Sequence, residues 1–172
     1  ADYILFETSG AIGAVEARID TASMFGQLGL GFVPDPSVIR QLADVYTAAW
    51  GSQVAPSVAS LYSVEGRLSV NSGAPAVGRP AIAAVAQGFM AALPDMQIIM
   101  DGLHIQADRA VYRWTLVGTN SGPGGTGKPI RISGFEVWRI GADGLIMESN
   151  GYFDSAAWQH QLEHGAKDAL SE

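Results

Sequence analysis

The stretch GTNSGPGGTGKPIRISGFEVWRIGADGLIMESNGYFD, residues 118–154, decides the fold of this protein. Its GPGGTG, residues 122–127, fits the phosphate-binding pattern G-x-G-x-x-G letter for letter. In dinucleotide-binding proteins these glycines open a helix, whereas here they lead into the strand-like run PIRISGFEVWRI. We therefore expect a flexible hairpin loop at 121–128 that binds no nucleotide, followed by a tight hairpin at GADG, residues 141–144.

Four consecutive runs have the composition of β-strands: MQIIMDGLHIQ, AVYRWTLVGTN, PIRISGFEVWRI and LIMESNGYFD. Their short links predict an antiparallel meander, preceded by one more strand at 67–71. Helical periodicity dominates upstream, with an N-cap at Asp35, Pro36 in the first turn and a stop at Gly51. The expected apolar stripe of this helix is Val38, Leu42, Val45, Tyr46 and Ala49.

Further helices are expected at 54–62, from Pro80 to Leu93, from about Ser155 and, on a weaker pattern, at 11–25. The helix that Pro80 opens has the apolar face Ile82, Val85, Phe89 and Leu93. Helices followed by a curved antiparallel sheet indicate an α+β fold.

The composition limits the classes of function that the protein can have. The chain has 172 residues, 48% hydrophobic and 16% charged, which fits one globular domain. A net charge of −7 with only 10 Lys and Arg argues against binding nucleic acid or an anionic membrane. The absence of Cys excludes disulfides and thiolate chemistry. The acidic start, ADYILFETSG, does not resemble an export signal, so a cytoplasmic location is the default expectation.

The run HQLEH, residues 160–164, fits the zinc-protease pattern H-x-x-E-H, with His160 and His164 on one helix face. Little sequence follows that could add a third ligand, so we interpret it as a solvated terminal helix. We expect no metal and no cofactor.

Strand phase points to a pocket. If Arg131 and Arg139 face water, period two places Ile132, Gly134, Glu136, Trp138 and Ile140 on the other face. The reverse phase would bury two arginines that each need a partner. In the preceding strand, Arg113 and Thr115 then face outward, and Tyr112, Trp114, Leu116 and Asn120 face inward. Large aromatics around a desolvated carboxyl are typical of an apolar ligand pocket.

The outward faces of the same two strands carry Val111, Val117, Phe135 and Val137 beside arginines. An apolar centre with a polar rim suits a two-fold interface, so we expect a homodimer.

Residues 36–163 resemble the SnoaL-like polyketide cyclase branch of the nuclear transport factor 2-like superfamily. The resemblance lies in ALPDMQIIMDGLHIQADRAVYRWTLVGTNSG, TGKPIRISGFEVWRIGADGLIMESNGYFD and SAAWQHQL. It implies a cone of three helices against a curved, mostly antiparallel sheet that encloses a pocket, and dimers through the outer face. The domain would span 34–164, between an N-terminal extension, 1–33, and a C-terminal tail, 165–172.

The resemblance also implies chemistry. Family cyclases close a ring by an aldol reaction without metal or cofactor, but Gly151 stands at the position of their acid/base Asp. Asn120 stands at the position of a usual His. A fainter resemblance to ketosteroid isomerase places Tyr46 and Glu136 at its oxyanion-hole positions. Its base would fall near Ser69 or Asn71, and neither is a base.

The leading hypothesis is a cofactor-free enzyme that transfers a proton at carbon on an apolar carbonyl compound, as an aldol cyclase, isomerase or dehydratase does. Tyr46 and Glu136 would stabilise the enolate, and His104 or Asp101, beside a candidate bulge at Gly102, would move the proton. The expected substrate-binding residues are Asn71, Tyr112, Trp114, Asn120, Trp138 and Ser149. The alternatives are a non-catalytic protein that binds a hydrophobic small ligand and a dimeric interaction module.

Overall fold

The structure, a computed structural model, describes residues 33–167. The helix expected at 11–25, almost all of the 1–33 extension and most of the C-terminal tail lie outside these residues. Helices α2 (Pro36–Gly51), α3 (Ala55–Ala59) and α4 (Arg79–Ala92) precede most of the sheet, and α5 (Ser155–His164) follows it. The strands are β1 (Tyr62–Val70), β2 (Ala76–Val77), β3 (Gln97–Gln106), β4 (Arg109–Thr119), β5 (Pro129–Ile140) and β6 (Ile146–Phe153). This is the α+β fold that the sequence predicts.

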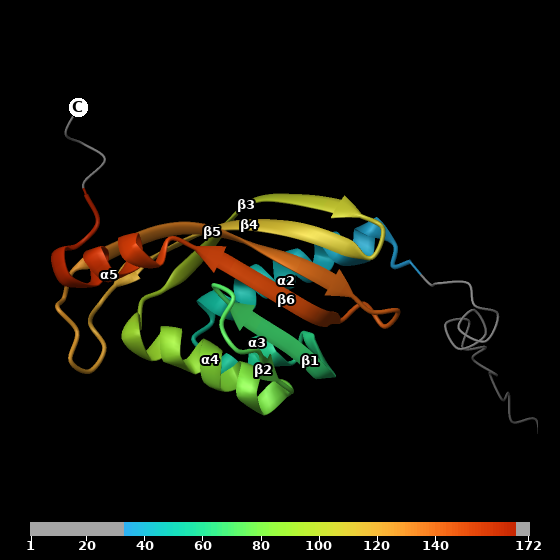
Figure 1. Cartoon of the computed structure of the whole chain (residues 1–172), viewed down its shortest axis with the longest axis horizontal. Coiled ribbons are helices and arrows are strands. Elements are labelled where there is room, and N and C mark those ends of the chain that lie inside the picture. The colour runs from blue at the N-terminus through green and yellow to red at the C-terminus, as the bar shows by residue number, and fades with distance from the viewer. Residues whose placement is uncertain (1–32, 168–172) are drawn as a thin grey trace, which may run out of the picture. The chain divides into compact units, whose positions relative to one another are not determined.

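One curved sheet of six strands has the order β2-β1-β6-β5-β4-β3. Strands β3 to β6 form the expected antiparallel meander, while β1 pairs in parallel with β6. Figure 1 shows α2 along one face of the sheet, with α4 beside β1 and β2. Two boundaries differ from the sequence prediction. Helix α3 ends at Ala59 rather than 62, and β1 begins at Tyr62 rather than 67.

Helix α2 begins as predicted, because the Asp35 side chain accepts a hydrogen bond from the backbone N–H of Ser37 and Pro36 opens the first turn. Its stripe is shifted from the prediction. Val38 and Val45 are exposed, because the face that packs on the sheet is centred one residue later. The buried positions are Ile39, Leu42, Ala43, Tyr46, Ala49 and Trp50. This phase directs Tyr46 and Trp50 toward the interior of the sheet.

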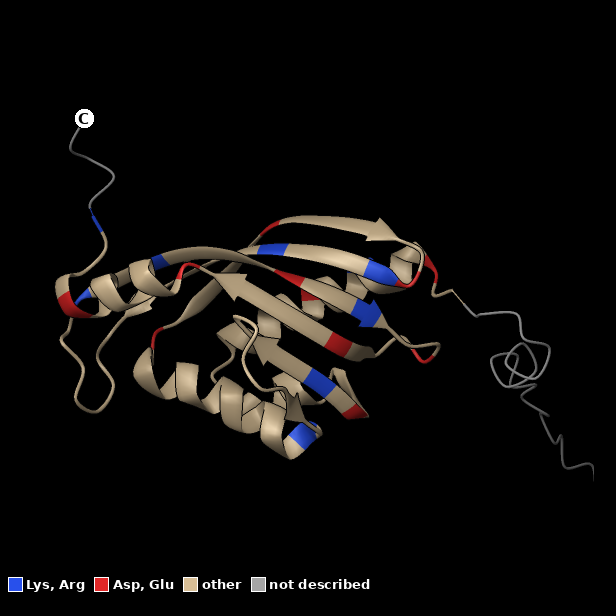
Figure 2. Ribbon diagram, viewed as in Figure 1, with Lys and Arg blue, Asp and Glu red and all other residues tan. Residues whose placement is uncertain are grey.

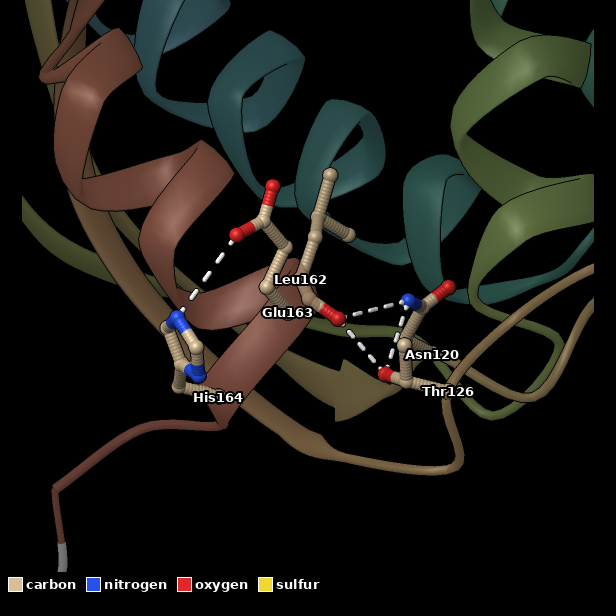
Figure 3. A network of polar contacts seen from close by, with 5 residues as sticks. All are labelled: Asn120, Thr126, Leu162, Glu163 and His164. Atoms are coloured by element: carbon tan, nitrogen blue, oxygen red, sulfur yellow. Dashed lines mark hydrogen bonds and ion pairs between the residues drawn. The ribbon is translucent and has the colours of Figure 1, made fainter.

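The glycine loop joins two strands and opens no helix, as predicted. A side chain at Gly122 would collide with the carbonyl oxygen of Ala91, so the loop lies against the end of α4. Asn120 Nδ2 and Thr126 Oγ1 both donate to the carbonyl oxygen of Leu162, at 3.1 and 2.6 Å (Figure 3). Gly122 therefore lets the loop pack closely against the end of α4, while Asn120 and Thr126 join the loop to α5.

Basic residues are spread over several elements (Figure 2), and Arg109 and Arg139 lie opposite each other across the β4–β5 pair. No helix among residues 33–167 is long and apolar enough to cross a membrane.

Candidate functional site

A pocket lies on the inner face of the sheet, with α2 and α4 opposite. It has a cavity volume of about 50 Å³ and walls that are almost entirely apolar or aromatic. Partly exposed side chains from α4, α5 and the end of β6, Phe89, Trp158 and Phe153, stand at its outer part. Tyr46 and Glu136 stand at its buried part. The pocket on this face is the one that strand phase predicted.

Of the carboxyls in residues 33–167, only Glu136 lines the pocket, and three neutral donors hold one of its oxygens. Its Oε2 accepts from Ser149 Oγ at 2.6 Å, from Trp138 Nε1 at 2.8 Å and from Tyr46 Oη at 2.9 Å. Within residues 33–167 no hydrogen bond reaches Oε1, which is also not among the fully buried polar atoms. Oε1 is therefore the oxygen that remains available on the pocket side.

Burial raises the pKa of Glu136 above its ordinary value of 4.5, because desolvation penalises the charged form. The donated bonds from Ser149, Trp138 and Tyr46 act in the opposite direction, since they stabilise the carboxylate. The net direction is upward. Among residues 33–167 no Lys, Arg or His lines the pocket, and Glu136 forms no ion pair with an arginine of this range.

The structure places the Tyr46 hydroxyl against the carboxyl of Glu136. Tyr46 is fully buried, and its hydroxyl lies 2.9 Å from Glu136 Oε2 and 3.1 Å from the hydroxyl of Tyr62. Burial raises the pKa of both tyrosines, so both remain protonated donors. Tyr46 therefore binds Glu136 instead of pointing a second donor at a shared substrate oxygen.

Trp138 and Ser149, expected to bind substrate, are both fully buried and donate to Glu136. Tyr112 and Trp114 line the pocket. The Tyr112 ring stacks on Trp138 at 4.8 Å between centroids, and its hydroxyl bonds Thr47 Oγ1 at 2.7 Å. These contacts hold the rings of Tyr112 and Trp138 in place beside Glu136.

The two residues expected to supply a base lie on the opposite face of the sheet. The β3–β4 register shifts between Met100 and Gly102, so a bulge forms at Asp101, as the glycine suggested. Asp101 Oδ2 accepts from Thr115 Oγ1 at 2.6 Å, on the outer face. His104 is exposed opposite Val111, also on that face. Neither side chain can reach a ligand in the pocket, which corrects their placement.

Thr115 lies on the outer face, as strand phase predicted, although it is only 4% exposed. Its hydroxyl contacts Asp101 and also Ser133 Oγ, at 2.8 Å, and these neighbours shield it from water.

The two asparagines expected to orient substrate have structural contacts instead. Asn120 joins the glycine loop to α5, as Figure 3 shows. Asn71 is exposed, and its side-chain oxygen accepts from the backbone N–H of Phe153 at 2.9 Å, which ties the end of β1 to β6. Gly151, at the position where the resemblance implies an acid/base Asp, lies on β6 opposite Glu136 on β5. The carboxyl of this site therefore comes from β5 rather than from β6.

Sequence reasoning missed several walls of the pocket: Trp50, Phe153 and Trp158, which it did not name, and Phe89, which it treated as core. Trp50 follows Tyr46 by four residues, so helical spacing could have found it. Trp158 packs against Phe89 and Phe153 at 5.7 and 5.8 Å between ring centroids. That contact joins elements distant in sequence, and no local pattern predicts it.

The HQLEH run lies on α5, with the His160 and His164 rings 4.7 Å apart on one face, as expected. Both histidines are exposed, and His164 contacts Glu163 at 3.6 Å (Figure 3). Residues 33–167 hold no group of three or more His, Asp or Glu side chains arranged to bind a metal.

This fold recurs in a known family. The SnoaL-like domain matches residues 43–149, more than half of the chain. The chain belongs to the SnoaL-like family. Searched against curated proteins, it matches none.

Solved structures agree on the fold of this SnoaL-like domain. A protein from Jannaschia sp. CCS1, assigned as a SnoaL-like polyketide cyclase, is 16% identical with a TM-score of 0.68, over 77% of this chain and 98% of that one. TsrD from Streptomyces laurentii is 22% identical with a TM-score of 0.66, over 76% and 98%. A protein of ketosteroid isomerase-like fold from Catenulispora acidiphila, in complex with trimethylamine, is 15% identical with a TM-score of 0.64, over 75% and 94%.

Proposed function

We propose that this protein transfers a proton at carbon on a small apolar carbonyl compound, with Glu136 as the group that accepts and returns the proton. The observation that carries the proposal is the asymmetry of the Glu136 carboxyl. Three donors hold Oε2, and Oε1 receives no hydrogen bond from residues 33–167. A proton accepted by Oε1 leaves these three bonds in place.

The raised pKa of Glu136 supports this role, because a carboxyl that titrates nearer neutral pH is a stronger base and a usable acid. A single carboxyl is sufficient for this reaction. The same group can remove a proton from one carbon of the substrate and deliver it either to another carbon or to the carbon it came from. Tyr46, Ser149 and Trp138 are then positioning residues that act through Glu136. Asp101 and His104 have no part in this mechanism, since they lie on the outer face.

The test is deuterium exchange at the activated CH₂ of β-tetralone, a flat bicyclic ketone, in D₂O and followed by proton NMR. The wild-type protein should accelerate exchange above buffer. Glu136→Gln should lose about 10²- to 10⁴-fold of that acceleration, as expected for loss of a general base. Asp101→Asn, a carboxyl-to-amide change on the outer face, is the matched control and should exchange as wild type does. Equal rates in wild type and Glu136→Gln would refute the proposal.

A second candidate is binding of a small ligand without chemistry. The narrow cavity of about 50 Å³ and its aromatic walls favour it. The Catenulispora structure holds trimethylamine, and a small ammonium ion binds well against aromatic faces near a carboxylate. Calorimetry with trimethylammonium tests it. Binding together with no exchange of β-tetralone would favour this candidate over catalysis.

We also propose a homodimer through the outer face of β4 and β5. Phe135 is 42% exposed there and packs against Tyr152 at 5.2 Å between ring centroids. Val111, Val117 and Val137 are partly exposed on the same face. Sedimentation should give a dimer at micromolar concentration and a monomer for Phe135→Lys. A wild-type monomer would contradict the proposal.

A further inference from the structure

Two glycines lie on the inner face of the sheet near Glu136: Gly134, two residues before it on β5, and Gly151, opposite it on β6. A glycine inside a strand weakens the strand, because it has more backbone freedom to lose and packs no side chain. Such a glycine is explained by a left-handed backbone, by a bulge, or by the close approach of a protein group or a ligand. The two glycines have different explanations.

Gly134 is required by the protein itself. A Cβ added there would stand 2.5 Å from the carbonyl oxygen of Tyr152 and 2.6 Å from Cζ2 of Trp114. The backbone of Tyr152 belongs to the β5–β6 ladder, and the Trp114 side chain is buried, so neither neighbour can move freely. Any larger residue would displace part of the sheet, and no ligand is needed to explain this glycine.

None of these protein-based reasons applies to Gly151. Its backbone is not left-handed, and it pairs in register with Glu136 on β5 and Val70 on β1, away from the shifts in both ladders. Among residues 33–167, an added Cβ would meet only Cγ of Glu136, at 3.4 Å, and the carbonyl oxygen of Ser69, at 3.7 Å, within 4 Å. Both are ordinary van der Waals contacts, so the described part of the chain does not require a glycine here.

The space beside Gly151 belongs to the pocket. Gly151 is buried, and it lines the cavity together with Glu136 and Phe153. Period two places Gly151 on the same face of β6 as Ser149 and Phe153. Cγ of Glu136 is bonded to the carboxyl carbon, so the position that a Cβ would take lies beside the carboxyl group. A ligand group in that position is therefore next to the atoms that exchange the proton.

We propose that Gly151 determines the specificity of the site, because the space that it leaves beside Glu136 takes a substituent on the reacting carbon of the ligand. This role rests on the proposed function, in which Glu136 Oε1 removes a proton from that carbon. The substituent is an alkyl group, since the walls of the cavity are almost entirely apolar. The substrate class is then a ketone whose acidic carbon carries one hydrogen and one alkyl branch.

The test places one methyl group either on the ligand or on the protein. Calorimetry compares β-tetralone with methyl-β-tetralone, which carries a methyl group on the activated carbon. Wild type should bind the methylated ketone about fourfold more tightly, the gain from burying one more carbon. Gly151→Ala fills the same space from the protein. It should bind β-tetralone within about twofold of wild type, and the methylated ketone at least about tenfold less tightly than β-tetralone.

Gly88→Ala, on the exposed side of α4, is the matched control, because an added Cβ there meets no atom of residues 33–167 within 4 Å. It should keep the wild-type preference for the methylated ketone. Urea denaturation follows folding: the midpoint should fall for Gly134→Ala and should not fall for Gly151→Ala. A lower midpoint for Gly151→Ala would mean that packing requires this glycine, and would overturn the proposal.

The binding measurement overturns the proposal if wild type binds neither ketone or binds the methylated one more weakly than β-tetralone. It does so too if Gly151→Ala keeps the wild-type preference. Deuterium exchange separates these results from the proposed function. The expected change of preference without any acceleration of exchange would preserve the Gly151 contact and refute catalysis by Glu136. Accelerated exchange without the change of preference would support catalysis and refute the role of Gly151.

Discussion

The two faces of the sheet each hold a carboxyl group that accepts a hydrogen bond from a hydroxyl at 2.6 Å. On the inner face Ser149 donates to Glu136, and on the outer face Thr115 donates to Asp101. The bonds are alike, but the surroundings differ. Glu136 is 7% exposed, with aromatic rings around it, whereas Asp101 is exposed.

This difference shows that desolvation, rather than the hydrogen bond, makes one carboxyl a candidate acid and base. Burial raises the Glu136 pKa even though three donors oppose it. The site is therefore defined by the rings that exclude water from the inner face.

The largest expected effect comes from removing each carboxyl. Glu136→Ala leaves Tyr46, Trp138 and Ser149 without their acceptor in a dry core, so the free energy of unfolding should fall by about 3 kcal/mol. Asp101→Ala on the outer face should change it by less than about 1 kcal/mol, because water replaces the lost contact. Urea denaturation measures both. Similar losses for the two variants would show that the faces do not differ as described.

The sequence predicted part of this difference between the two faces of the sheet. Period two in PIRISGFEVWRI was enough to place Glu136 and Trp138 inward, because two arginines fixed the phase of that strand. The same logic could not place Asp101 and His104. One extra residue at the β3 bulge decides which face each side chain joins, and only the register with β4 reveals it.

The second limit of the sequence prediction was the choice of hydrogen-bond partners. Strand phase placed Trp138 in the pocket, the resemblance to ketosteroid isomerase placed Tyr46, and Ser149 was an expected substrate-binding residue. None of these predictions showed that all three donate to one oxygen of Glu136. That convergence depends on β5, β6 and α2 meeting in space. Asn120 faces inward in phase, yet it joins the glycine loop to α5, because the sheet extends past the end of the pocket.

A smaller effect should follow when one hydroxyl is removed from each face. Ser149→Ala deletes the shortest bond to Glu136 and should raise its pKa further, since the carboxylate loses a stabilising donor. The pH profile of β-tetralone exchange, which rises as the base ionises, should move to higher pH. Thr115→Val deletes the equivalent hydroxyl from Asp101 and should leave the profile unchanged. A profile that moves to lower pH in Ser149→Ala would contradict the assigned direction.

The smallest effect is the dependence of stability on pH, and its sign separates Glu136 from the other carboxyls. The folded-state pKa of Glu136 lies above its ordinary value of 4.5, so between these two values the native state binds more protons than the unfolded state. Stability from this group is complete below 4.5 and is lost as pH rises through the folded pKa, with a slope of at most about 1.4 kcal/mol per pH unit. Hydrogen bonds lower the pKa of Asp35 and Asp95, whose contributions are lost only as pH falls below 3.8.

Glu136→Gln isolates the contribution of Glu136 to the pH dependence of stability, because glutamine does not titrate. Free energies of unfolding for wild type and Glu136→Gln, measured between pH 4 and 8, should differ by an amount that declines as pH rises. Asp35→Asn should run parallel to wild type over that range, because the contribution of Asp35 is lost only below 3.8. A wild-type advantage that grows with pH would mean that the fold prefers the Glu136 carboxylate. Donor bonds would then outweigh desolvation on the inner face, and the contrast between the two faces would be lost.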